Sequence, residues 1–192
     1  MLSPQILLAS QSPRRAELLA QIGVRFEVIS VDVPELLTAG ESPSEFVQRL
    51  AVEKARAGWQ VSEQSLPVLG ADTIVVLGDD ILGKPVFKGD AEAMLALLSG
   101  QTHSVMTAVA VVDGDRTLQR LSISKVSFRD TTEAERLAYV ATGEPADKAG
   151  AYAIQGQAAV FIEKLEGSYS GVMGLPLFET AEIFREIAID VI

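Results

Sequence analysis

The fold is decided near the start of the chain by Ile6-Leu7-Leu8-Ala9-Ser10-Gln11-Ser12-Pro13-Arg14-Arg15-Ala16-Glu17-Leu18-Leu19. The apolar run over residues 6–9 predicts a short buried strand. Ser12 suits the N-cap of a helix, and Pro13 suits its first position, where a missing N–H costs nothing. The stretch therefore predicts a strand, a turn and a helix, which is how an α/β fold opens.

Two arginines conflict with the rest of this predicted helix. Arg14 and Arg15 place positive charge in the first turn, where the helix dipole disfavours it. Local conflicts of this kind are expected at functional sites. An anion held by the helix N–H groups, by Ser10 and Ser12, and by one or both guanidinium groups would remove the conflict. Two solvated surface arginines are the alternative, and the local sequence leaves both open.

The composition indicates one acidic globular domain over residues 1–192. Hydrophobic residues make up 48% of the chain and the net charge is −10 at pH 7. This composition supports a substantial core and disfavours nucleic acid or an anionic membrane as a partner. The absence of cysteine excludes disulfides and a thiol nucleophile. No stretch reads as a signal peptide or a membrane span, so we expect a cytoplasmic protein.

A second informative stretch, residues 68–77, reads as a buried strand with Asp72 inside it. A carboxylate in a dry strand costs several kcal/mol unless it is paired, hydrogen-bonded or bound to metal. Asp72 is therefore a candidate functional residue. The alternative is a strand broken at Gly70, with Asp72 in a local turn.

Hydrophobic periodicity and turn signals predict the remaining elements. Strands are expected over 26–31, 104–113, 117–128 and 160–165, and helices over 44–59, 91–99, 132–142 and from 176 onward. Asp90 is expected to cap the helix over 91–99, and Thr132 with Glu135 forms a capping box. A change of apolar parity between residues 121–123 and 126–128 suggests a bulge. The single histidine, His103, is interpreted as structural.

Three further polar residues stand at distinctive positions. Glu35 follows a predicted strand, where loops of α/β sheets host ligands, although most such carboxylates are simply solvated. Lys54 continues the apolar stripe of its helix, and either reaches water along the surface or points into a polar cleft. Lys84 precedes Pro85, so its backbone is held extended.

Six motifs spread in order over nearly the whole chain resemble the Maf family of nucleoside triphosphate pyrophosphatases. They are Leu8-Ala9-Ser10-Gln11-Ser12-Pro13-Arg14-Arg15, Gly70-Ala71-Asp72-Thr73, Gly83-Lys84-Pro85, Ser99-Gly100-Gln101-Thr102-His103, Asp147-Lys148-Ala149-Gly150-Ala151-Tyr152 and Gly174-Leu175-Pro176. The resemblance implies an α/β fold of Maf/ITPase-like type, with a mixed twisted sheet flanked by helices and two lobes around a central cleft. It also implies a cytoplasmic homodimer that hydrolyses nucleoside triphosphates to monophosphate and pyrophosphate with a divalent metal.

The resemblance also implies roles for individual residues. Ser10, Arg15, Lys54 and Lys84 match phosphate-binding positions, whereas Glu35 and Asp72 match acidic positions, with Asp72 as proton acceptor. Arg14, Thr73 and Gln155 match positions that separate branches of the family. The 7-methyl-GTP branch tends to have Trp, Gln and Glu there, so this chain resembles the branch that acts on dTTP and UTP. The chain departs from its relatives at residues 157–159, where they are often glycine-rich.

The chemistry of the residues agrees with this resemblance. Arg14, Arg15, Lys54 and Lys84 can hold a triphosphate, while Glu35 and Asp72 offer the hard oxygen ligands that suit Mg²⁺ or Mn²⁺. A carboxylate can take the proton of a water that attacks the α-phosphorus. Two alternatives stay open. One is a nucleotide-binding regulator of cell division and septum formation without significant turnover, and the other is a phosphatase that removes single phosphates.

Overall fold

The computed structural model describes residues 3–191, and the chain divides into two compact units. The first unit comprises residues 1–72, 107–122 and 174–192, and the second comprises 73–106 and 123–173. Strands β3 (Val68–Leu77), β5 (Thr102–Asp113) and β6 (Arg116–Phe128) contribute residues to both units. The expectation of one domain over residues 1–192 stays a prediction.

Within the described residues, seven strands form one sheet. Its mixed parallel and antiparallel pairing is what the family resemblance implied. The strand order is β2-β1-β3-β5-β6-β7, with β4 beside β3. The further strands are β1 (Ile6–Leu8), β2 (Phe26–Val28), β4 (Asp80–Leu82) and β7 (Ile162–Glu166). β1 pairs in parallel with β2 and β3, whereas β4 and β7 pair antiparallel with β3 and β6.

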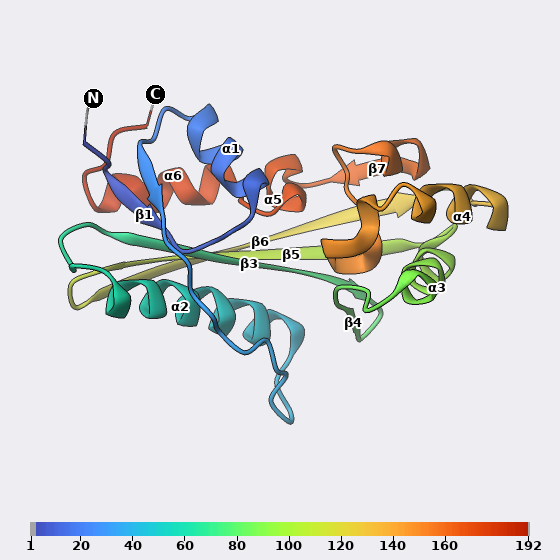
Figure 1. Ribbon diagram of the computed structural model, residues 1–192, viewed down its shortest axis with the longest axis horizontal. Coiled ribbons are helices and arrows are strands. Elements are labelled where there is room, and N and C mark those ends of the chain that lie inside the picture. The colour runs from blue at the N-terminus through green and yellow to red at the C-terminus, as the bar shows by residue number, and fades with distance from the viewer. Residues whose placement is uncertain (1–2, 192) are drawn as a thin grey trace. The chain divides into compact units, whose positions relative to one another are not determined.

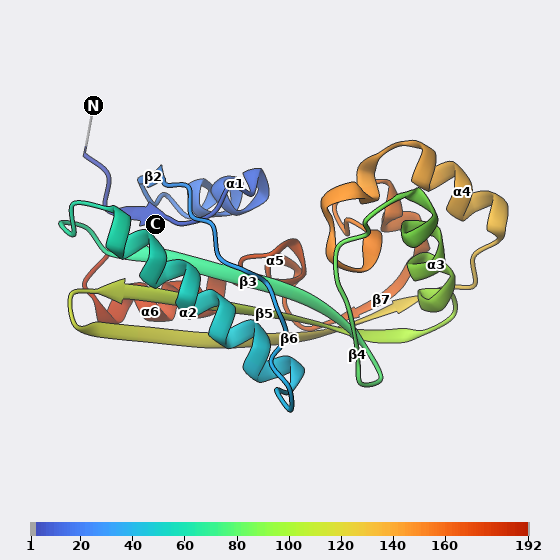
Figure 2. The same ribbon diagram turned by 60° about the horizontal axis from the view of Figure 1, so that its bottom comes forward.

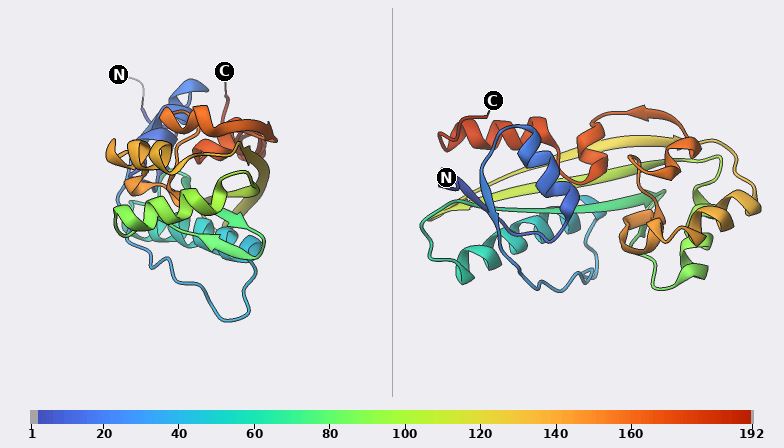
Figure 3. Two further views of the ribbon diagram at one scale, coloured as in Figure 1. Left: turned by 90° about the vertical axis from the view of Figure 1, so that its right-hand side faces the viewer. Right: turned by 45° about the horizontal axis from the view of Figure 1, so that its top comes forward.

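The first unit is a layered α/β arrangement. Helix α1 (Pro13–Gln21) leads from β1 to β2, and α2 (Pro43–Val61) leads back from β2 to β3. Because these right-handed crossovers run in opposite directions along the sheet, α1 and α2 cover opposite faces (Figure 1). Helix α6 (Leu177–Glu186) also lies opposite α2 (Figure 3, right). The sheet of this unit is therefore covered on both sides, and β1 is buried along its whole length.

Helix α2 packs very closely on β3 at Gly70. A Cβ atom at Gly70 would lie 2.5 Å from the backbone nitrogen of Ala55 and 2.6 Å from the carbonyl oxygen of Ala51. Gly70 therefore permits a close helix–strand approach and does not break the strand, which continues from Val68 to Leu77. The prediction that Asp72 lies inside a buried strand is confirmed.

The second unit gathers two helices and several short turns around its own core. Figure 2 shows α3 (Lys88–Leu98) and α4 (Glu133–Ala141) grouped with the 3₁₀ turns η1 (Glu144–Asp147), η2 (Ala149–Ala151) and η3 (Gln157–Phe161). Helix α5 (Tyr169–Met173) completes the unit. Leu95, Phe128, Tyr152 and Phe161 are among its buried core residues. No helix between residues 3 and 191 is long and apolar enough to cross a membrane.

Most predicted elements are confirmed within a few residues, including the capping box of Thr132 and Glu135. Strand β2 ends at Val28, three residues early, and β4 was not foreseen. The N-cap of α3 is Phe87, so the prediction for Asp90 was wrong. Asp90 lies in the first turn, where its carboxylate accepts the Val86 N–H at 3.1 Å.

The change of buried face suggested for β6 does not occur. Ser122, Ser124, Val126 and Phe128 are all buried, because small serines continue the inward-facing row and leave Ile123 51% exposed. The sequence pattern was misread because the inward-facing positions 122 and 124 carry serine, which a pattern of apolar residues does not mark as buried. A register irregularity does lie at Ser127 and Phe128, in the pairing of β6 with β7.

Candidate active site

The turn between β1 and α1 brings Ser10 and Arg15 together. The Arg15 guanidinium donates through Nη1 to Ser10 Oγ at 3.2 Å and through Nε to the Gly174 carbonyl at 2.7 Å. Ser10 Oγ also accepts the backbone N–H of Ser12 at 3.2 Å. Ser12 is the N-cap residue, as expected, but its own side chain makes no capping bond. The turn is thus organised by Ser10 and by a carbonyl far along the chain.

Charge and burial act on Arg15 in opposite directions. Burial lowers the pKa of Arg15, the negative charge of Asp72 raises it, the positive charge of Arg14 lowers it, and Glu35 raises it. An arginine keeps its charge through shifts of this kind. The first turn of α1 therefore carries a fixed positive charge within electrostatic reach of two carboxylates.

Lys54 joins those two carboxylates. Its Nζ atom donates to Asp72 Oδ1 and to Glu35 Oε1, each at 2.6 Å. The exposed fraction of the side chain rises from 8% for Asp72 through 13% for Lys54 to 39% for Glu35. The close approach of α2 to β3 at Gly70 brings Lys54 within reach of Asp72, two residues farther along the same face of the strand. Lys54 therefore contacts polar partners and does not simply extend along the surface to water.

Asp72 is the most buried member of this group, with 6% of its surface exposed. Burial raises the pKa of Asp72, and the nearby charge of Glu35 acts in the same direction, whereas Lys54 and Arg15 lower it. A carboxylate with a raised pKa binds a proton more strongly than an exposed one. Asp72 thus has the environment expected of a general base.

Glu35 and Asp72 also fit a divalent cation. One ammonium group contacts both carboxylates, so their oxygens lie no farther apart than twice 2.6 Å. Mg²⁺ is commonly held by one or two carboxylates together with substrate phosphates. No group of three or more His, Cys, Asp and Glu side chains suited to a metal occurs among residues 3–191. A cation held at this position would take two of its ligands from these carboxylates.

The other predicted site residues are placed as follows. Arg14 is half-buried in the first turn of α1, beside Arg15. Thr73 follows Asp72 directly in β3, so the two side chains point to opposite faces of the sheet. Lys84 is exposed just after β4, and Gln155 is exposed in the turn that precedes η3. Thr73, Lys84 and Gln155 belong to the second unit, and the roles predicted for all these residues stay predictions.

Sequence reasoning missed two sets of partners. The first is the Gly174 carbonyl that anchors Arg15, although Gly174 lies in one of the quoted motifs. The second is a group of hydrogen bonds around the segment 152–157, made by His103, Tyr139 and Glu144. His103 and Tyr152 both lie in motifs quoted in the sequence analysis, and this was the only indication from sequence that they are connected.

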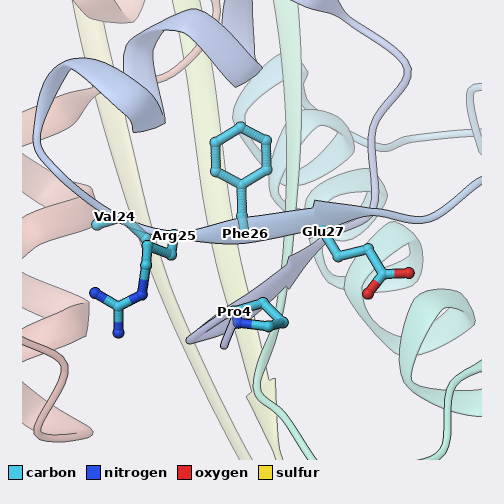
Figure 4. Close-up of a pocket in the computed structure, with 5 residues that line it drawn as sticks. All are labelled: Pro4, Val24, Arg25, Phe26 and Glu27. Carbon is cyan, nitrogen blue, oxygen red and sulfur yellow. The ribbon is translucent and has the colours of Figure 1, made fainter. Parts of the chain in front are cut away.

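A separate depression lies along the edge strand β2. Pro4, Val24, Arg25, Phe26 and Glu27 line it (Figure 4). Figure 4 shows Phe26 pointing away from Arg25 and Glu27, as alternation along a strand requires. None of the predicted site residues lines this depression, so it does not belong to the candidate active site.

The fold and these side chains define an α/β protein whose first unit combines an arginine at a helix start with a charged Asp–Lys–Glu group in which the aspartate is buried. The chain belongs to the family of Maf-like proteins, which it matches over residues 5–187. It is 55% identical to the dTTP/UTP pyrophosphatase of Saccharophagus degradans, over 98% of this chain and 91% of that one. It is 56% identical to the dTTP/UTP pyrophosphatase of Alkalilimnicola ehrlichii, over 97% of this chain and 95% of that one.

Among solved structures, the chain resembles the Staphylococcus aureus Ham1 protein. The TM-score is 0.51 at 12% sequence identity, with 95% of this chain and 97% of that chain covered. A likeness at such low identity concerns the fold alone. It supports the mixed α/β architecture that the sequence predicted.

Proposed function

We propose that this protein hydrolyses dTTP and UTP to the nucleoside monophosphate and pyrophosphate. The observation that carries the proposal is the charged group in which Lys54 contacts both the buried Asp72 and the more exposed Glu35, within electrostatic reach of Arg15. This group offers a base, two metal ligands and fixed cations, which are the parts that phosphoanhydride hydrolysis needs. The names of the two relatives supply the choice of dTTP and UTP.

In the proposed reaction, the oxygen of a water molecule forms a bond to the α-phosphorus. The bond between that phosphorus and the oxygen bridging to the β-phosphate breaks, and pyrophosphate leaves with the electron pair. Asp72 accepts the proton of the attacking water, a role that its raised pKa supports. Ser10, Arg14, Arg15, Lys54 and Lys84 bind phosphate oxygens in this proposal.

A divalent cation, Mg²⁺ or Mn²⁺, is the proposed cofactor, held by Glu35 and Asp72. When bound, it neutralises phosphate charge and favours departure of pyrophosphate. Lys54 contacts the same two carboxylates through one ammonium group. With a cation held by Glu35 and Asp72, the charge of Lys54 would be available for a phosphate oxygen.

Base recognition is assigned to Gln155, with Arg14 and Thr73. Thymine and uracil share one edge, an N3–H donor between two carbonyl acceptors. The amide of Gln155 offers an acceptor and two donors, so it can pair with the N3–H and a neighbouring carbonyl. Cytosine presents a bare N3 acceptor and an amine there, so an amide held in the orientation that fits uracil is mismatched with cytosine. Sites built on hydrogen bonds reject such analogues strongly.

The proposal extends to the setting of the enzyme. We expect a homodimer in the cytoplasm that binds neither nucleic acid nor membrane. The net charge of −10 supports the lack of affinity for these two polyanionic partners. Light scattering coupled to size-exclusion chromatography would measure the oligomeric state directly.

Phosphorus NMR of the products tests the proposed reaction. The full-length protein is incubated with UTP, dTTP, CTP and 7-methyl-GTP, with Mg²⁺ or with EDTA. We expect pyrophosphate and monophosphate from UTP and dTTP with Mg²⁺, and no turnover with EDTA. Orthophosphate as the sole phosphate product would favour a phosphatase. Tight binding of UTP without any turnover would favour the regulator of cell division.

A further inference from the structure

Gln155 stands at the corner of a tight turn in the second unit. The Gly156 N–H donates to the Ala153 carbonyl at 3.0 Å, which closes a β-turn over residues 153–156. Ile154 is buried at the first corner, with 7% of its surface exposed, whereas Gln155 is exposed at the second. The backbone position from which the Gln155 side chain projects therefore depends on how firmly the two ends of this turn are held.

The leading end of the turn is held by a buried tyrosine of α4. Tyr139 Oη accepts the backbone N–H of Ala153 at 3.2 Å. One residue earlier, the Tyr152 hydroxyl is hydrogen-bonded to His103 Nε2 at 2.8 Å. Exposed fractions of 4%, 6% and 2% for Tyr139, Tyr152 and His103 show that water does not compete for these contacts. Backbone and side chain are thus both fixed just ahead of Gln155.

The trailing end is held by Glu144, at the start of η1. Its Oε2 atom accepts the backbone N–H of Gln157 at 3.1 Å, and its Oε1 atom accepts the Tyr139 hydroxyl at 2.7 Å. A Cβ atom at Gly156 would lie 2.2 Å from Oε1 and 2.4 Å from the carboxyl carbon. A side chain at position 156 would therefore displace the Glu144 carboxylate from the position in which it holds the turn.

Tyr139 and Glu144 act together because one hydroxyl serves both ends of the turn. The Tyr139 hydroxyl donates to Glu144 while it accepts from Ala153. Burial raises the pKa of Tyr139, and the hydrogen bond to Glu144 raises it further, so the hydroxyl keeps the proton that it donates. We call this pair, Tyr139 and Glu144, the turn clamp.

We propose that the turn clamp is a specificity-determining device, in which Tyr139 and Glu144 are positioning residues for the base-reading amide of Gln155. The inference rests on the proposed function, which makes Gln155 the residue that reads thymine and uracil. A hydrogen-bonding amide discriminates between bases only if its acceptor and donors keep a fixed direction. A loosened turn would let the amide rotate and accept cytosine.

The test measures kcat/KM for UTP and for CTP in clamp variants. Tyr139→Phe removes the shared hydroxyl, Glu144→Gln keeps one acceptor oxygen, and Glu144→Ala keeps none. We expect the UTP/CTP ratio to fall about tenfold in Tyr139→Phe, the equivalent of one hydrogen bond. The fall is expected to be smaller in Glu144→Gln than in Glu144→Ala. Each loss should come from a higher KM for UTP rather than a lower kcat.

Two controls separate positioning from general damage. Tyr169→Phe removes the hydroxyl of an exposed tyrosine in the same unit, and we expect its UTP/CTP ratio to equal that of the wild type. Hydrogen exchange of peptides covering residues 153–157 should be faster in the clamp variants than in the wild type. Because Glu144→Gln is nearly isosteric, it keeps the test decisive if Tyr139→Phe is too unstable to assay.

The outcomes distinguish the inference from the proposed function. A wild-type enzyme that does not distinguish UTP from CTP overturns both. A Gln155→Ala variant that retains the preference removes the base-reading role of Gln155, and the inference with it, but leaves the proposed hydrolysis standing. A wild-type enzyme that discriminates through Gln155, with clamp variants that keep the same ratio, overturns the inference alone. Equal losses for UTP and CTP would also overturn it, because they would indicate a purely structural role.

Discussion

The two units use opposite chemistry to hold their predicted functional residues. In the first unit, Lys54 contacts Asp72 and Glu35, so full charges hold one another in place. In the second unit, the turn that carries Gln155 is held by hydroxyl groups, backbone N–H groups and a single carboxylate, that of Glu144. The first unit holds its residues by ion pairs between opposite charges, and the second unit holds its turn by directional hydrogen bonds.

This difference matches what each region is proposed to do. A charged group responds strongly to a polyphosphate or a metal ion, because Coulomb interactions are large in partly buried surroundings. Charge alone does not distinguish one pyrimidine from another, since all nucleoside triphosphates carry the same phosphates. Hydrogen bonds of fixed direction do distinguish them. Reaction and base choice should therefore be separable by substitution.

The sharpest way to break the charged group is Asp72→Asn. Asn is nearly isosteric but cannot accept the proton of the attacking water, and it is a poorer metal ligand. We expect kcat for UTP to fall about a hundredfold or more, as is typical when a general base is removed. Steady-state pyrophosphate release measures the loss, and circular dichroism checks that the fold is intact.

Asp115→Asn provides the matched control, because Asp115 is exposed in the turn between β5 and β6. It makes the same chemical change outside the charged group and should leave turnover at the wild-type level. Full activity in Asp72→Asn would remove Asp72 from the reaction and weaken the pyrophosphatase proposal as a whole.

A smaller effect is expected when the recognition region is changed at Gln155 itself. Gln155→Glu removes the amide donors, so the side chain can no longer pair with a carbonyl of uracil or thymine. We expect the preference for UTP and dTTP over CTP to fall ten- to a hundredfold, about the value of one or two hydrogen bonds. Competition assays with paired substrates measure the ratio directly. An unchanged base profile would show that Gln155 is not the reader.

Local signals made the first unit predictable from sequence. The strand–turn–helix opening, the Ser12 N-cap position and the strand around Asp72 all follow from short-range rules, and the structure has them. The contacts of Lys54 were left open, because its partners Glu35 and Asp72 lie 19 and 18 residues away in sequence. The tight approach at Gly70 that makes the contact possible depends on tertiary packing, which periodicity does not encode.

The second unit was harder to predict, for the same reason. The segment 147–157 reads as an irregular loop of small residues, and its order comes from distant partners. His103 lies 49 residues from Tyr152, and Glu144 lies 13 residues from Gln157. His103 was interpreted as a structural residue, and its burial against Phe128 and Tyr152 fits that interpretation. Its contribution to the ordering of the turn was not visible in the sequence.

His103 makes the hydrogen-bonded region the one that should respond to mild acid. Burial lowers the pKa of His103 to about 4, and its Nδ1 atom is buried without a hydrogen-bond partner among residues 3–191. An unfolded histidine titrates near 6.5. As the pH falls below 6.5, the unfolded chain binds a proton that the folded chain does not, so stability decreases. The loss continues until the folded pKa is reached and then stops.

The smallest expected effect is therefore a pH dependence that belongs to His103 alone. Between pH 7.5 and 5.5, this residue should lower the free energy of unfolding by about 1.3 kcal/mol. His103→Gln keeps a polar group that can hydrogen-bond to Tyr152 but does not titrate. From pH 7.5 to 5.5, the free energy of unfolding of this variant should therefore fall by about 1.3 kcal/mol less than that of the wild type. Urea unfolding of both proteins at the two pH values measures the change.

Because His103→Gln alters packing as well, the comparison uses each protein's own change with pH and not its absolute stability. If the free energy of unfolding decreased equally in the two proteins, His103 would titrate in the folded state as it does in the unfolded chain. His103 would then make no contribution to the acid sensitivity of the second unit.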